Sequence, residues 1–128
     1  MRGFLIVFLG AGLGGALRHG VNLGAARLLP GAIGASTLAV NVLGALLMGI
    51  LIEGLAIKFD APQQWRLFLA TGVLGGFTTF SAFSLEVALL YERGQVLASA
   101  LYVMASVVGS IGALFAGLLL VRHFVGSD

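Results

Sequence analysis

The sequence contains no cysteine, only two prolines and few charged residues. Without cysteine, the chain has no disulfide, no thiolate metal ligand and no thiol redox chemistry. Charged residues make up 9% of the chain, whereas an average soluble domain has about 25%. Apolar residues make up 59% of the 128 residues, more than a soluble protein of this size could hide from water. The composition therefore indicates a membrane protein, with a single domain over residues 1–128.

Four apolar segments are each near or above the roughly 20 residues that a helix needs to cross a bilayer. They run from Phe4 to Leu23, from Ile33 to Ile52, from Leu67 to Leu90 and from Val96 to Val121. The first segment is longer than the core of a signal peptide, so we expect it to be a retained span. Both prolines lie in connections, where a missing N–H disturbs no helix. We predict an all-α membrane protein with four transmembrane helices.

Basic residues are distributed almost evenly between the two ends of these spans. The side of the termini would carry Arg2, Lys58, Arg66 and Arg122, and the other side Arg27 and Arg93, with Arg18 within the first span. So weak a positive-inside bias fits either one orientation with a modest signal or insertion in both orientations. Two opposed copies could pair about an axis in the membrane plane. Because four helices can hardly enclose a pore, we expect a pathway at the interface of a homodimer.

The third span contains the least membrane-like stretch, Gly75-Gly76-Phe77-Thr78-Thr79-Phe80-Ser81-Ala82-Phe83-Ser84. Irregular backbone at membrane depth survives only inside protein or beside a water-filled cavity. We predict that the third helix is broken near its centre, and such a break points to a binding or permeation site. It would free carbonyl oxygens, which are the ligands that hard cations prefer.

Phenylalanines recur at a spacing of three in this stretch, at Phe77, Phe80 and Phe83. That spacing aligns them along one helical face. The stripe either packs against other helices or turns its electropositive ring edges toward a small anion.

Polar residues share faces in the second and fourth spans. Thr37 and Asn41 are four residues apart, and the Asn41 amide either donates to a passing anion or bonds a neighbouring helix. Tyr102, Ser106 and Ser110 form a hydroxyl stripe, which is either a polar pathway or a set of small packing residues.

The first span combines small residues with one charge. Gly10 and Gly14 form a ridge suited to close helix packing. Arg18 is costly inside a span, so it either draws anions into a vestibule or satisfies helix-terminal carbonyls.

No enzyme site can be assembled from these residues. His19 and His123 are far apart in sequence, and no acidic pair lies at membrane depth. We expect Glu86, near the end of the third span, to reach the membrane interface without a catalytic role.

These motifs closely resemble the CrcB/Fluc family of small bacterial fluoride channels, and the resemblance covers all four spans. Its most specific part is the run from Gly75 to Glu86, which is similar to the family signature Gly-Gly-x-Thr-Thr-Phe-Ser-Thr-Phe-Ser-x-Glu. Ala82 stands where that signature usually has threonine, so one hydroxyl between the two key rings is missing.

The resemblance implies a dual-topology antiparallel homodimer in the bacterial inner membrane. Such a dimer would export cytoplasmic fluoride passively through two pores, with no enzymatic activity and no nucleic-acid partner. The implied fluoride pathway comprises Asn41, Phe80, Phe83, Thr37, Thr79, Ser81, Tyr102, Ser106 and Ser110, with Arg18 as a vestibule or structural charge. A structural sodium ion at the dimer centre would bind the backbone carbonyls of Gly75 and Thr78 from both subunits.

Two other functions are weighed against the channel. A small antiparallel secondary transporter would need an intramembrane carboxylate for proton coupling, and none is placed for that role in the sequence. An accessory subunit of a larger membrane complex would have no activity alone.

Overall fold

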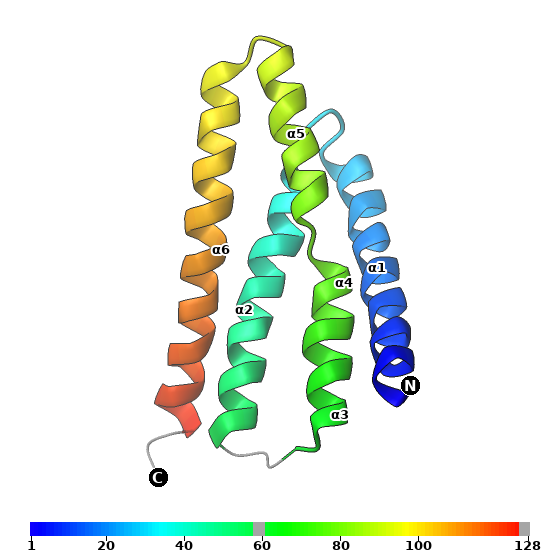
Figure 1. Ribbon diagram of the computed structural model, residues 1–128. Coiled ribbons are helices and arrows are strands. Elements are labelled where there is room, and N and C mark those ends of the chain that lie inside the picture. Colours follow the sequence, from blue (N-terminus) through cyan, green and yellow to red (C-terminus); the bar gives the residue numbers. More distant parts are fainter. Residues whose placement is uncertain (58–60, 126–128) are drawn as a thin grey trace.

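The computed structural model describes residues 1–57 and 61–125, and these residues form a bundle of helices (Figure 1). Within these ranges four helices are long and apolar enough to span a membrane: Arg2–Leu28, Ala35–Ile57, Gln63–Glu92 and Val96–Val125. The prediction of four spans is therefore confirmed. Lys58, which entered the charge comparison, lies outside the described residues.

Each long helix packs against a particular neighbour. Helix α1 (Arg2–Leu28) packs along the first half of the third span, and α2 (Ala35–Ile57) packs along α6 (Val96–Val125). Helix α1 begins and α6 ends at the same end of the bundle, as an even number of spans requires (Figure 1). The second helix begins at Ala35, two residues later than predicted, because Gly34 has a positive φ of 87° that ends the preceding turn.

The third span consists of several short elements in sequence. These are α3 (Gln63–Arg66), the π-helical segment η1 (Leu67–Leu74), α4 (Gly75–Phe77) and α5 (Phe80–Glu92). Gly75 and Gly76 lie in α4, whereas the residues with extended backbone are Thr78 (φ −88°, ψ 159°) and Thr79 (φ −153°, ψ 124°). The chain thus changes direction locally between α4 and α5.

Glycines bring the helix backbones into direct contact. Gly10 and Gly14 of α1 are buried, and a Cβ at Gly14 would overlap the carbonyl oxygen of Val73 in η1. On the other side of the bundle, a Cβ at Gly49 of α2 would overlap the carbonyl oxygen of Leu114 in α6. Close van der Waals packing of this kind drives helix association in lipid, where no hydrophobic effect acts between helices. The predicted packing role of the Gly10–Gly14 ridge is confirmed.

The large apolar side chains point outward. Phe4 is 82% exposed, Phe8 73% and Leu97 72%, whereas Val40 is the largest fully buried side chain among the described residues. An apolar exterior of this kind is what a lipid environment favours, although a few large side chains, such as Phe77, Phe83 and Tyr102, are buried.

Candidate functional site

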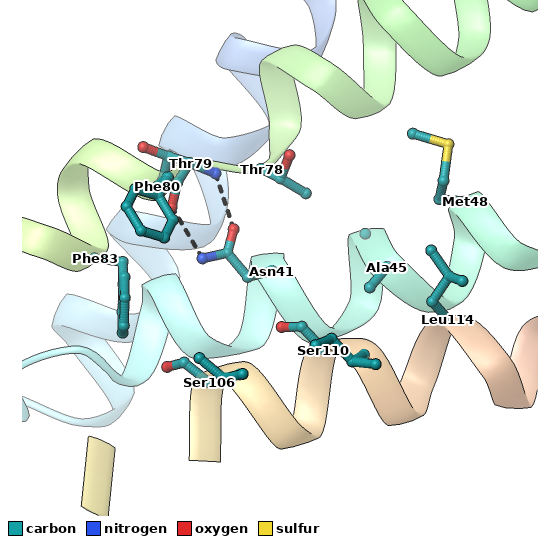
Figure 2. Close-up of a pocket in the computed structure, with 13 residues that line it drawn as sticks. Asn41, Ala45, Met48, Thr78, Thr79, Phe80, Phe83, Ser106, Ser110 and Leu114 are labelled. Carbon is teal, nitrogen blue, oxygen red and sulfur yellow. Dashed lines mark hydrogen bonds between the residues drawn. The ribbon is translucent and has the colours of Figure 1, made fainter. Parts of the chain in front are cut away.

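A reciprocal pair of hydrogen bonds holds the extended residue Thr79 against α2. The Thr79 N–H donates to Asn41 Oδ1 at 2.8 Å, and Asn41 Nδ2 donates to the Thr79 carbonyl at 3.0 Å (Figure 2). An extended backbone surrounded by helices has no strand to pair with, and unpaired backbone groups are costly away from water. The Asn41 amide supplies that missing partner. It uses one of its two N–H donors to do so.

Two backbone carbonyls lose their helical donors at this point. In a continuous helix the N–H of residue i+4 donates to the carbonyl of residue i, so Thr79 would serve Gly75 and Ala82 would serve Thr78. Instead, the Thr79 N–H donates to Asn41, and the Ala82 N–H donates to Thr79 Oγ1 at 3.2 Å. The second of these bonds is an N-cap for α5.

A groove of about 390 Å³ opens beside this junction, between α2, α5 and α6 (Figure 2). It brings together these predicted pathway residues: Asn41, Thr79, Phe80, Phe83, Ser106 and Ser110. The remaining wall is mostly apolar and includes Ala45, Met48 and Leu114. Ser106 Oγ is buried and has no hydrogen-bond partner among the described residues. The groove therefore combines apolar walls with a few polar groups, one of which is unpaired.

The two aromatic rings of the groove differ in exposure. Phe83 is 7% exposed, whereas Phe80 is 76% exposed, and their ring centroids are 5.4 Å apart at an angle of 57°. Phe77 is buried and does not line the groove. The extended residues Thr78 and Thr79 interrupt the helical spacing, so Phe77 does not continue the face of the other two rings.

Glu86 connects three elements through its carboxylate. Thr37 of α2 donates to Oε1 at 2.7 Å, and Tyr102 of α6 donates to Oε2 at 2.5 Å. Thr37 and Tyr102 were predicted in the pathway, but neither lines the groove; both hold Glu86 instead. The sequence reasoning assigned Glu86 to the interface and missed this arrangement. A lone acidic side chain within an apolar span was the signal that could have found it.

A second cavity, of about 470 Å³, lies beyond Thr79, which lines both spaces. Its walls include Arg18 and Asn22 of α1, Thr37 of α2, and Glu86 of α5, together with Arg93. Arg18 Nε donates to the Gly76 carbonyl at 3.3 Å, close to the end of α4. Arg18 thus satisfies a helix-terminal carbonyl, which is one of its two predicted roles, and it lines this cavity; the attraction of anions stays a prediction.

The other predicted residues lie around these spaces. Ser81 is exposed, with Oγ 3.3 Å from Thr79 Oγ1, and it lines neither cavity. Gly75 is also exposed. Over residues 1–57 and 61–125, no group of three or more His, Asp or Glu side chains is placed to hold a metal ion. Any cation ligands in the described chain would therefore have to come largely from the backbone.

The fold and the site together define an integral membrane protein with a partly polar groove at membrane depth. The family model described as "CrcB-like protein, Camphor Resistance (CrcB)" matches residues 5–118. This chain belongs to that family.

Several curated relatives carry the same name. The chain is 58% identical to a "Fluoride-specific ion channel FluC" from Methylobacterium nodulans, over 94% of this chain and 96% of the relative. It is 55% identical to a protein of that name from Granulibacter bethesdensis, over 98% of both chains. A third, from Hyphomonas neptunium, is 54% identical over 96% of this chain and 98% of the relative. These names belong to channels rather than enzymes, and together with the four spans they identify a multi-pass membrane protein.

Removal of the Asn41 amide is expected to destabilise the fold. In Asn41→Ala, the N–H of Thr79 loses its partner and the Thr79 carbonyl keeps only its bond within α5, at a cost of about 1–3 kcal/mol for the unsatisfied N–H. The thermal unfolding midpoint of the purified protein in detergent measures the loss. Asn22→Ala is the control, because the hydrogen bond between Ser36 and Asn22 is exposed. Equal midpoints for the two variants would show that the Asn41 pair contributes little.

Proposed function

We propose that this protein is a passive fluoride channel of the bacterial inner membrane. The observation that carries the proposal is the groove, in which hydrogen-bond donors and two phenylalanine rings meet beside a non-helical backbone segment. The relatives described above, named as fluoride-specific channels, support fluoride as the permeating ion. The alternative of a small secondary transporter now has one candidate carboxylate, Glu86, but both of its oxygens already accept hydrogen bonds.

The physical task of such a channel is to replace the water around a small anion. The second N–H of Asn41 and the hydroxyls of Ser106 and Ser110 are donors on the groove wall. The edges of the Phe80 and Phe83 rings carry partial positive charge, so they can face an anion although the rings have no N–H or O–H group. Ser106 Oγ, buried without a partner among the described residues, is the donor most readily available. Thr79, Thr37, Ser81 and Tyr102 support this pathway from its margin.

The groove is open on one side, and we assign a second copy of the chain to that side. Phe80 is 76% exposed although it lies in the groove, so a partner surface is needed to enclose the ring. The weak charge bias of the sequence permits an oppositely oriented partner. An antiparallel pair would repeat the groove and so provide two pathways at one interface.

A structural sodium ion fits the backbone of the third span, which in this proposal acts as a broken helix. The carbonyls of Gly75 and Thr78 lack the donors that a continuous helix would give them, because those donors bond Asn41 and Thr79. Carbonyl oxygens are suitable ligands for a hard cation. When bound between two copies, the ion would neutralise these dipoles and join the subunits.

The ring of Phe80 is the most direct test of the pathway. In liposomes that contain only this protein, Phe80→Ile is expected to reduce fluoride efflux by about tenfold or more, because an aliphatic side chain has no electropositive edge. Phe8→Ile is the matched control, since Phe8 is similarly exposed (73%) but lies on α1. Both variants should remain dimeric by size-exclusion chromatography. Normal efflux through well-folded Phe80→Ile protein would refute the role of the ring.

The same assay separates the three functions. Fluoride efflux that exceeds chloride efflux and needs no pH gradient supports the channel. Efflux that requires a pH gradient would favour the secondary transporter, and no efflux would favour the accessory subunit.

Dual topology is testable because the native chain has no cysteine. Gln95→Cys introduces a single thiol in the exposed connection between α5 and α6. In intact cells, a membrane-impermeant maleimide is expected to label about half of the copies, and the rest should react only after permeabilisation. A cysteine introduced at Gly3, at the opposite end of the bundle, should give the same fraction. Labelling of nearly all copies at one position and none at the other would establish a single orientation.

Sodium binding should appear as a cation-specific gain in stability. A ligand that binds only the folded state raises the unfolding midpoint as its concentration rises. We expect the midpoint of the purified dimer to increase with sodium chloride and not with N-methylglucamine chloride at equal ionic strength. Identical midpoints in the two salts over the whole range would count against the ion.

A further inference from the structure

Gly34, the last residue before α2, lies directly against the ring of Tyr102. Its φ of 87° lies in the left-handed region, which side-chain-bearing residues rarely adopt. A Cβ at this position would lie 2.6 Å from both Cε2 and Cζ of Tyr102 and 3.0 Å from its hydroxyl oxygen. Both the backbone conformation and the space therefore require glycine here.

The Tyr102 ring, which Gly34 contacts, connects two other residues of the site, Glu86 and Phe83. Tyr102 is buried, its hydroxyl donates to Glu86 Oε2, and its ring centroid is 5.2 Å from that of Phe83 in the groove. A ring displaced by a methyl group at position 34 would have to move away from Glu86, or push on Phe83, or both.

The same glycine also fixes the second donor to Glu86. The Gly34 carbonyl accepts from the N–H of Leu38 at 2.8 Å and so forms the first turn of α2. Thr37 lies in that turn, and its hydroxyl donates to Glu86 Oε1. One loop residue thus sets the place of both side chains that hold the carboxylate.

We propose that Gly34 is a positioning residue for the ion pathway. It acts through Tyr102 and Thr37 on Glu86, and through the Tyr102 ring on Phe83. It touches no permeating ion itself. This inference rests on the proposed function, since the quantity that Gly34 controls is fluoride permeation.

The first experiment compares two glycine-to-alanine variants. Gly34→Ala and Gly94→Ala both place alanine at a positive φ (87° and 79°), but Gly94 has no atom within 4 Å of the added Cβ. We expect Gly34→Ala to reduce fluoride efflux from liposomes by about threefold or more, and Gly94→Ala to stay within about twofold of the native protein. Equal efflux from the two variants would overturn the proposal.

A second comparison asks whether the loss passes through the Tyr102 hydroxyl. Tyr102→Phe removes only that group, so Gly34→Ala should reduce efflux less in a Tyr102→Phe background than in the native protein. A purely structural role predicts the same fold-reduction in both backgrounds. That outcome would overturn the route through the Tyr102 hydroxyl to Glu86.

The unfolding midpoint distinguishes the effect of the contact with Tyr102 from the effect of backbone strain at position 34. It remains informative if Gly34→Ala folds poorly. Tyr102→Ala removes the ring, so in that background Gly34→Ala should lower the unfolding midpoint no more than Gly94→Ala does. If Gly34→Ala still lowers the midpoint more than Gly94→Ala does when the ring is absent, the contact is not the cause.

A spectroscopic measurement tells failure of this inference from failure of the proposed function. The chain has two tyrosines, so 3-fluorotyrosine in a Tyr91→Phe background reports on Tyr102 alone. We expect its ¹⁹F resonance to shift in Gly34→Ala and not in Gly94→Ala. If the ¹⁹F resonance shifts in Gly34→Ala but the protein without this substitution conducts no fluoride, the contact is supported and the channel function is refuted. An unshifted resonance would refute the positioning role even if the parent conducts.

Discussion

The Asn41–Thr79 pair is the interaction on which the rest of the site depends. Two backbone groups of an extended residue are satisfied by one side chain from another helix. Because that side chain takes the Thr79 N–H, the carbonyl of Gly75 loses its helical donor. Because Thr79 is extended, its hydroxyl can cap α5 and orient Phe80 and Phe83 toward the groove. The Gly75 carbonyl without a helical donor, the ring pair and the start of α5 all follow from this single contact.

Polar chemistry at membrane depth is arranged here in two layers. The groove is lined by the side chains of Asn41, Ser106 and Ser110, and Ser106 Oγ is buried without a hydrogen-bond partner in the described chain. Behind it, Glu86 accepts hydrogen bonds from Thr37 and Tyr102 inside the bundle. An acceptor in this position orients the hydroxyls of Thr37 and Tyr102. The glycine contacts between helices allow this polar interior within so small a bundle.

The spans were predictable because their signal is local and strong: long apolar runs separated by proline, glycine and charge. Spacing marked Asn41, Phe80, Phe83, Ser106 and Ser110 as candidates with open alternatives, and the resemblance to the family implied that they line one pathway; the structure places them in one groove. Pairwise partners were not predictable, because helix periodicity says which residues share a face and not which face a neighbour meets. Thr37 and Tyr102 share faces with Asn41 and Ser106, yet both bond Glu86 rather than line the groove. Phe77 was misplaced for another reason, since the extended pair resets the helical phase.

The two hydrogen bonds between Asn41 and Thr79 use only main-chain atoms of Thr79. The departure from helix at this point therefore depends on a side chain of α2, 38 positions earlier in the chain, as well as on the capping hydroxyl of Thr79. A residue at position 79 needs a side-chain oxygen to cap α5, whereas the residue at position 41 must offer both a donor and an acceptor to the backbone of residue 79. Substitutions at positions 41 and 79 should therefore be considered together, because the side chain at position 41 decides which residues position 79 tolerates.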